Sequence, residues 1–452
     1  MEKKLANRLL EFLDDSVCCF QAVDNIKKIL LAHGFTELRE DERWEIELGG
    51  KYFVSRNGSS IIACKVPEGG FDKWHITATH SDSPSFKVKE NPENCDDRYV
   101  RINVEPYGGG IFSTWMDKPI SVAGRVVIKK NGEYVTRLVN VDRDLLMIPN
   151  LAIHMDKTAN SGHKYDPKKD MLPLYGTMDA KDTFLDEVAS YATNMDLNFD
   201  GIDGVSGEDA EKAGIQGDLF DTEILKGEDI LAYDLYLYNR MKGKVWGGKD
   251  EFICAPRIDN LQCTFGTLMG FLEGAGQEQG AMYCVFDNEE VGSGTKQGAE
   301  STFLRDVIER IGLALGMDRE DVYVTLAKSF MISADNAHGY HPNHSEVADK
   351  DNSPNLNGGI VIKYNANQKY CTDGFSAAVF KDLCNSVGVP FQTYANRADM
   401  PGGSTLGNIS STKVSINSVD IGLAQLAMHS AYETAGVKDV EYLAKVCAKF
   451  FE

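Results

Sequence analysis

The sequence contains no long uninterrupted apolar run and few basic residues for its length. Of its 452 residues, 47 are Lys or Arg and 68 are Asp or Glu, which gives a formal net charge of −21. Binding to nucleic acid needs clustered Lys and Arg to contact the phosphates, so we expect no nucleic-acid partner. Nowhere do about 18 apolar residues follow one another, which is the minimum for a membrane-spanning helix. We therefore expect no membrane partner.

Signal-peptide and disulfide patterns are also absent. The N-terminal stretch MEKKLANRLLEFLDDS is interrupted by Glu11, Asp14 and Asp15 before it could form the apolar part of a signal peptide. The ten cysteines are scattered and form no CxxC pair, which is typical of buried, reduced thiols. Both features favour a cytoplasmic protein. The length and the 42% hydrophobic residues predict a globular chain with a large core and exclude a small disulfide-stapled scaffold.

Common catalytic motifs are missing as well. The sequence has no HExxH and no GxSxG. The run GSGTKQG from Gly292 has a last spacing one residue too long for a dinucleotide-binding fingerprint, so we interpret it as a turn. His338, His341 and His344 could hold a metal ion, but Pro342 disfavours the helix that would align them. We interpret these histidines mainly as the lining of a pocket.

Local periodicity predicts helices and strands that differ along the chain. Residues 3–33 have the apolar spacing of two amphipathic helices, and the short strands KYFVSRNGSSIIACKV and WHITATH follow. Residues 99–154 are rich in strand signals, ending with the run LLMIPNLAIHM, and Asn131-Gly132 predicts a hairpin turn. This stretch is interpreted as a separate β-rich unit.

Two further segments of the chain differ in composition and in the structure that they predict. Residues 176–220 contain many Gly and Asp and predict an acidic, solvated helix-and-loop segment. From about residue 250, strands alternate with helices, starting with FICAPRIDN and LQCTFGTLMGFLEGA. Such alternation indicates an α/β fold with parallel strands, whose functional residues gather where the strands end.

Potential metal ligands follow four of the apolar, strand-like runs, and one more lies near the C-terminus. Imidazole and carboxylate groups together suit zinc, manganese or cobalt, and no thiolate is needed. The adjacent pair of glutamates differs from an ordinary surface pair because it lies between the apolar run AMYCVF and the tight turn VGSG. These features predict a divalent-metal site. The residues are His80, Asp82, Asp259, Glu289, Glu290, Asp335, His338 and His429.

Seven motifs, in order along nearly the whole chain, resemble the M18 metallopeptidases, the aspartyl aminopeptidase family. They are HITATHSDSPSFKVK, PRIDN, FDNEEVGSGTKQGA, ISADNAHGYHPNH, VIKYNANQKY, MPGGSTLG and LAMHSAYETAG. The resemblance implies an α/β catalytic domain of the zinc-peptidase type, with a mixed sheet flanked by helices and interrupted by a β-rich insert used in subunit association. The catalytic domain would comprise residues 1–92 and 246–452, and the insert residues 93–245. A homo-oligomer, in the form of a dodecamer built from dimers, is expected.

The same resemblance assigns two divalent metal ions to each subunit. His80, Asp259 and Asp335 would bind one ion. Asp259, Glu290 and His429 would bind the other, so that Asp259 would bridge the two. Zinc is the expected metal, with cobalt and manganese as alternatives.

Further roles follow from the resemblance. Glu289 would be the general base, and Asp82 would orient His80. His154, in the insert, would complete the pocket of a neighbouring subunit. The expected substrate contacts are His338, Lys363 and Tyr370.

The expected activity is the release of single N-terminal residues from peptides, with a preference for Asp or Glu. An aminopeptidase of broader specificity and a metal-dependent deacylase are alternatives on the same site. A protein that forms an assembly without catalysis is the rival from a different class, and the complete set of ligands together with Glu289 argues against it.

Overall fold

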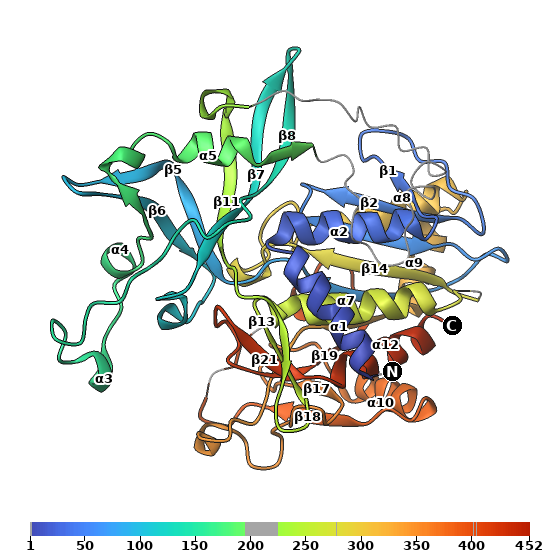
Figure 1. Ribbon diagram of the computed structural model, residues 1–452. Helices are drawn as coiled ribbons and strands as arrows, with labels where there is room; N and C mark the ends of the chain where they lie inside the picture. The colour runs from blue at the N-terminus through green and yellow to red at the C-terminus, as the bar shows by residue number, and fades with distance from the viewer. Residues whose placement is uncertain (1, 195–224, 277, 401, 404) are drawn as a thin grey trace.

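The computed structural model describes residues 2–194, 225–276, 278–400, 402–403 and 405–452. Figure 1 shows an α/β unit that contains both termini and a β-rich unit beside it. The predicted fold class, a mixed α/β architecture with helices flanking the sheet, is confirmed.

The α/β unit is built on a nine-stranded mixed sheet. Its order is β1-β2-β3-β14-β4-β15-β19-β17-β18, in which β14, β4, β15 and β19 are parallel neighbours. The flanking strands β3 and β17 are antiparallel to β14 and β19. The strands are β1 Thr36–Leu38, β2 Lys51–Arg56, β3 Ser60–Lys65, β4 Trp74–His80, β14 Gly280–Phe286, β15 Phe330–Ala334, β17 Ile360–Tyr364, β18 Phe391–Ala395 and β19 Asn417–Gly422.

Helices cover both faces of this sheet, because its central strands are apolar on both sides. In β14, Tyr283 and Val285 face one apolar core while Met282 and Cys284 face the other. The helices of the first face are α1 Glu2–Asp15, α2 Cys19–Ala32, α7 Ile258–Glu273, α10 Gly374–Ser386 and α12 Asp439–Phe450. Those of the second face are α8 Phe303–Ala314, α9 Arg319–Lys328 and α11 Leu406–Ser410. The two predicted N-terminal helices are α1 and α2.

The β-rich unit is a seven-stranded antiparallel sheet with its own apolar core. Its order is β10-β8-β7-β11-β5-β6-β9, and the predicted hairpin turn joins β7 to β8, with positive φ angles at Asn131 and Gly132. The strands are β5 Ser85–Cys95, β6 Tyr99–Tyr107, β7 Ile120–Lys130, β8 Glu133–Asn140, β9 Leu174–Thr177, β10 Ala192–Asn194 and β11 Ala232–Asn239, and the helices are α3 Ala159–Gly162, α4 Pro167–Asp170 and α5 Phe184–Ser190. We call this unit the insert; domain limits at residues 93 and 245 stay a prediction.

A third sheet, of five strands, corrects one expectation. The run FICA forms β13, which pairs antiparallel with β21 here instead of joining the parallel strands of the main sheet. Pro256 and the left-handed Arg257 (φ 60°) follow it and turn the chain into α7. The strands are β12 Lys244–Trp246, β13 Phe252–Ala255, β16 Ala337–His338, β20 Ala424–Leu426 and β21 Glu433–Gly436.

Two expectations for the insert are wrong in part. The run LLMIPNLAIHM forms only isolated bridges up to Ile148, because Pro149 has no N–H for a strand ladder. The segment 176–220 is not entirely solvated, since α5 buries Phe184 and Val188 in the core of the insert. Its residues 195–220 lie outside the described part of the chain.

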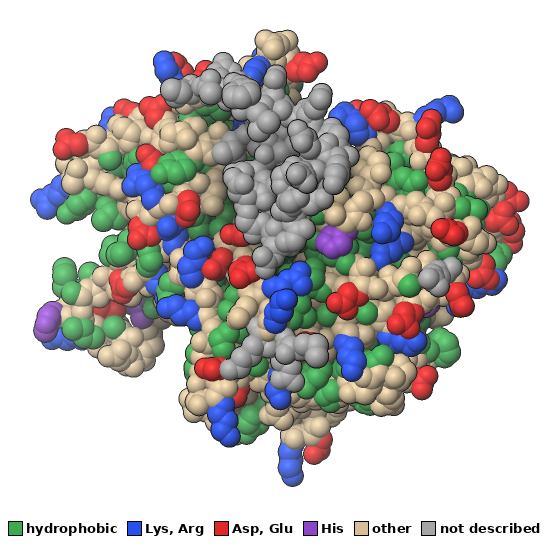
Figure 2. Space-filling model, turned by 45° about the vertical axis from the view of Figure 1, so that its right-hand side comes forward, with side chains coloured by type: hydrophobic (Ala, Val, Ile, Leu, Met, Phe, Trp, Pro, Cys, Tyr) green, Lys and Arg blue, Asp and Glu red, His purple; other side chains and the backbone are tan. Residues whose placement is uncertain are grey.

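The surface gives two further findings. Figure 2 shows acidic and basic side chains interspersed over the face that it draws, so the excess of negative charge is not gathered in one place there. Within the described residues, no helix is both long and apolar enough to cross a membrane.

Candidate metal centre

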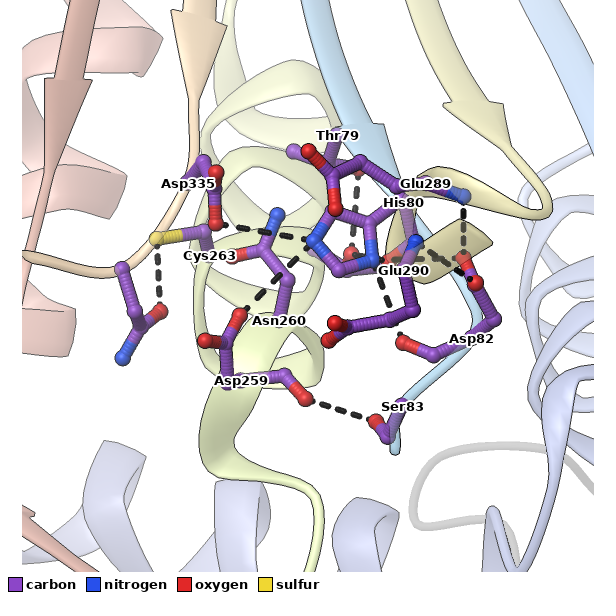
Figure 3. A network of polar contacts seen from close by, with 12 residues as sticks. Thr79, His80, Asp82, Ser83, Asp259, Asn260, Cys263, Glu289, Glu290 and Asp335 are labelled. Carbon is purple, nitrogen blue, oxygen red and sulfur yellow. Dashed lines mark hydrogen bonds and ion pairs between the residues drawn. The ribbon is translucent and has the colours of Figure 1, made fainter. Parts of the chain in front are cut away.

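Three adjacent parallel strands bring most of the predicted ligands to one edge of the main sheet. His80 is the last residue of β4 and pairs with Phe286 at the end of β14. Asp335 follows β15, and Glu289 and Glu290 lie in the short turn after β14. The side chains therefore converge although they are far apart in the sequence (Figure 3).

Asp259 comes from the first turn of α7 and not from the main sheet. Its backbone N–H donates to the Glu433 carboxylate (3.0 Å), and its carbonyl accepts a hydrogen bond from Ser83 (2.6 Å). These two bonds hold the backbone on either side of the Asp259 side chain, which is 5% exposed.

Arg257, two residues before Asp259, ties this turn to the first helix. Its guanidinium donates to the carbonyl oxygens of Leu13 (2.8 Å) and Ser16 (2.9 Å) at the end of α1. The free carbonyls at a helix C-terminus favour a positive charge in this place.

His429 lies in the loop between β20 and β21, with a positive φ of 67°. Its N–H donates to Glu433 (2.7 Å), so that Glu433 holds the backbones of both Asp259 and His429. Its Nδ1 lies 3.0 Å from the carbonyl oxygen of Gly109 in the insert. A carbonyl only accepts, so Nδ1 carries the proton and Nε2 keeps its lone pair.

The carboxylate of Asp259 lies between two imidazoles. Its Oδ1 is 3.7 Å from His80 Nε2, and its Oδ2 is 3.6 Å from His429 Nε2. A second carboxylate accompanies each histidine: Asp335 Oδ1 is 3.5 Å from His80 Nε2, and Glu290 Oε2 is 3.5 Å from His429 Nε2. The site thus contains two groups of donors that share Asp259. Donor atoms of His80, Asp259 and Glu290 also lie within 4.8 Å of one another.

The residues present fit divalent metal ions. Separations of 3.5–3.7 Å are too long for good hydrogen bonds. Two ligands about 2.1 Å from a tetrahedral zinc ion lie about 3.4 Å apart. Asp259 Oδ1 is buried and has no hydrogen-bond partner, which is costly unless a cation faces it.

The electrostatics lead to the same conclusion. Burial, followed by the neighbouring carboxylates, raises the pKa values of Asp259 and Glu290 well above their ordinary range. Burial also acts to raise the pKa of Asp335, but the Lys363 ammonium and the His80 imidazole overcome it and lower that pKa. Buried carboxylates so close together repel one another, and a bound divalent cation would remove this cost.

Asp82 contacts His80 as well as the backbone of the two adjacent glutamates. Its carbonyl oxygen is 3.1 Å from His80 Nδ1, and its carboxylate Oδ1 is 3.4 Å from the same nitrogen. The carboxylate accepts the backbone N–H groups of Glu289 (3.1 Å) and Glu290 (3.2 Å). It also accepts the hydroxyl proton of Tyr107 from the insert (2.8 Å).

Glu289 differs from Glu290 in its environment. Burial raises its pKa to about 7, although the nearby His80 acts in the opposite direction. Its side chain lines the open pocket beside the donor groups. A carboxyl with such a pKa can exchange a proton near neutral pH.

The predicted substrate contacts lie along the same pocket, with Tyr394 beside them. His338 and Tyr370 both line it. Lys363 is only 3% exposed; its Nζ donates to the carbonyl of Asn336 (2.7 Å) and is 3.7 Å from Asp335. Lys363 is the only Lys or Arg among the described residues that line this pocket.

Three predicted histidines do not line the pocket of their own subunit. His154 lies in an exposed loop of the insert, between Ile153 (51% exposed) and Met155 (75% exposed). His341 and His344, in the loop after β16, are not among the residues that line this pocket; His344 is exposed and His341 half-buried, and their rings lie 4.9 Å apart.

Sequence reasoning missed residues that form hydrogen bonds to the predicted ligands or to Asp82 and so fix their positions. Glu433 lies four residues after His429 in a motif already noted, so its spacing offered a signal. Tyr107 and Gly109 offered none, because nothing in a β-rich segment shows that it packs against the residues of the predicted metal site.

Comparison with known families and curated proteins gives consistent matches. The family model described as "Aminopeptidase I zinc metalloprotease (M18)" matches residues 12–451. A "Probable M18 family aminopeptidase 2" from Clostridium acetobutylicum is 42% identical, over 100% of this chain and 99% of that protein. "Aspartyl aminopeptidase 4" from Saccharomyces cerevisiae is 37% identical, over 98% of this chain and 93% of that protein.

Solved structures match over the whole chain. A chain in a cryo-EM structure of the Ape4 and Nbr1 complex superposes with a TM-score of 0.90 at 32% identity, covering 100% of this chain and 86% of that chain. The S. cerevisiae mApe1 dodecamer structure gives a TM-score of 0.80 at 26% identity, covering 99% and 96%.

Proposed function

The chain belongs to the M18 family of zinc aminopeptidases, and from this premise we propose that it is a two-metal enzyme that removes single, preferably acidic, N-terminal residues from peptides. One observation carries the two-metal assignment: the two oxygens of the Asp259 carboxylate face two different histidines at 3.7 and 3.6 Å. His80 and Asp335 would hold one ion with Oδ1 of Asp259. His429 and Glu290 would hold the other with Oδ2.

We propose zinc as the metal, which the family description supports. Two divalent ions in such a site supply Lewis acidity, which makes water a stronger acid and polarises a carbonyl oxygen. The chain's own contribution to proton transfer is Glu289. It accepts the proton of the attacking water as the new C–O bond forms, and it donates that proton to the leaving nitrogen as the C–N bond breaks.

Asp82 is proposed as a positioning residue. It fixes the backbone of both glutamates and lies beside Nδ1 of His80, so it sets the direction in which His80 Nε2 points.

Two features support an acidic preference. Lys363 supplies positive charge at the wall of the pocket, and the S. cerevisiae relative is named an aspartyl aminopeptidase. His338 and Tyr370 are proposed to contact the substrate beside it. We further propose a dodecamer built from dimers, in which His154 reaches a neighbour's pocket. The S. cerevisiae mApe1 dodecamer is similar in fold to this chain, which supports the assembly.

A panel of peptides tests the proposal. The zinc-loaded protein is assayed with Asp-, Glu-, Leu- and Lys-initiated peptides of otherwise identical sequence, and with an N-acetylated Asp peptide. We expect the highest kcat/KM for Asp and Glu and no cleavage of the acetylated peptide. Equal rates for all free N-termini would favour the broader aminopeptidase, and release of acetate would favour a deacylase. If the folded, metal-loaded protein cleaved no peptide, the non-catalytic alternative would stand.

A further inference from the structure

The insert supplies one short segment to the rear of the metal centre, directly after β6. This segment, which we call the YGGG segment, contains Tyr107, Gly108, Gly109 and Gly110. It contacts the site at three places, and each contact involves a different residue: His429, Asp82 and Glu290.

The first contact orients His429. The Gly109 carbonyl accepts the Nδ1 proton of His429 (3.0 Å), and the N–H of Ile111, next after the segment, donates to the His429 carbonyl (2.9 Å). Hydrogen bonds therefore hold both the imidazole ring of His429, at Nδ1, and its backbone, at the carbonyl oxygen. This arrangement directs Nε2 of His429 towards Asp259 and Glu290. Partners of this kind at the remote nitrogen of a ligating histidine fix its tautomer and orientation.

The second contact acts through Asp82. The Tyr107 hydroxyl donates to Asp82 Oδ2 (2.8 Å) and accepts a hydrogen bond from the Asn288 amide (2.8 Å). Asp82 in turn accepts the N–H groups of Glu289 and Glu290. Tyr107 thus connects the strand-end turn of β4 with the turn that follows β14.

The third contact is steric. Gly108 has a φ of +71°, and a Cβ atom at this position would lie 3.0 Å from Cβ of Glu290 and 3.4 Å from Cα of Pro84. Only glycine adopts this backbone without strain and leaves Glu290 its place.

From these three contacts we infer that the YGGG segment is a structural part of the metal centre, so that the insert determines how tightly the subunit retains its metal ions. Tyr107 is a positioning residue, since it touches no proposed ligand side chain directly. The inference rests on the proposed two-metal site but not on the identity of the peptide substrate.

The test measures metal binding in the full-length assembled protein. Zinc dissociation constants are determined by competition with a chromophoric chelator for wild type, Tyr107→Phe and Gly108→Ala. We expect the dissociation constant of at least one ion to rise about 10- to 100-fold in each variant, as for other partners of metal ligands. With limiting zinc, kcat should fall while KM changes little. Tyr134→Phe, on the exposed side of β8 (74% exposed), is the matched control and should bind zinc as the wild type does.

The melting temperature of the zinc-free protein separates a metal-positioning role from a general structural one. We expect Tyr107→Phe to leave it unchanged while zinc affinity falls. Wild-type zinc affinity in Tyr107→Phe would overturn the inference, as would an equal loss of zinc affinity in Tyr134→Phe. If Gly108→Ala does not fold, Tyr107→Phe alone decides. Weaker zinc binding in these variants would support the inference even if no peptide were cleaved. Variants that cleave peptides and bind zinc as tightly as the wild type would reject the inference but leave the proposed function intact.

Discussion

Glu289 and Glu290 are neighbours in one short turn, yet their side chains have different surroundings. Glu290 Oε2 faces His429 at 3.5 Å, whereas Glu289 lines the pocket and has a pKa that burial raises to about 7. We therefore expect Glu289→Gln to retain both of the proposed metal ions and to lose turnover by about 10²- to 10⁴-fold, because the proposed proton acceptor is removed. Metal content and kcat of the same preparation check this.

The neighbouring residue provides the matched control. Glu290→Gln should release metal as well as lose activity, because its oxygen is a proposed ligand. If Glu289→Gln released metal and Glu290→Gln did not, the roles of base and ligand would be exchanged.

At the scale of helices, α7 carries Asp259 and depends on close packing against α12. A Cβ atom at Gly270 would lie 2.4 Å from Cys447 Cβ and 2.6 Å from the Ala444 carbonyl oxygen. Gly270→Ala should therefore lower the free energy of unfolding by about 1–3 kcal/mol, the usual cost of overpacking. Denaturant unfolding measures it. Gly374→Ala, at the first turn of α10 with nothing within 4 Å of its Cβ, should change stability by less than about 0.5 kcal/mol.

The exposed loop around His154 in the insert leads to a prediction about contacts between subunits. Leu151, Ile153 and Met155 are all more than half exposed, which is unusual for neighbouring apolar side chains unless another molecule covers them. If His154 acts in a neighbour's pocket, His154→Phe should lower kcat/KM of the assembled protein about 10-fold or more without changing its zinc content. His33→Phe, at an exposed helix end, serves as the control. An unchanged rate in an intact assembly would remove His154 from the pocket.

Elements with a strong local pattern were predictable, and contacts between elements were not. The ends of β4, β14 and β15 were predictable because apolar runs stop at charged residues. The sheet that contains β13 was not, because FICA has the composition of a buried strand in either sheet. The contact from Tyr107 to Asp82 joins two units that the sequence pattern treats separately, so only the structure reveals it.

For the whole molecule, we expect the effect of pH on stability to depend on whether metal is bound. Without metal, burial raises the pKa of Glu289 from 4.5 to about 7 and raises that of Asp259 and Glu290. A carboxyl whose pKa is raised by folding stabilises the protein most below its unfolded pKa, and this contribution is lost as pH rises towards the folded pKa. His80, whose pKa is also raised, acts in the same direction.

We therefore expect the chelator-treated protein to lose stability between about pH 4.5 and 7. The metal-loaded protein should lose less, because bound carboxylates are already ionised. Melting temperatures at pH 5, 6, 7 and 8, with and without chelator, check this. A chelator effect that shrinks as pH rises would contradict it.

The hydrogen bonds from Arg257 to the end of α1 make the metal site depend on the N-terminal helix. A subunit that begins after Ser16 would still contain every proposed ligand and every pocket residue. It would lack the Leu13 carbonyl that holds Arg257, which lies 241 positions after Ser16 and two before Asp259. Proteolytic trimming of the first helix, or a fusion partner that displaces it, should therefore lower activity by loosening the turn that carries Asp259, the carboxylate proposed to be shared by two metal ions.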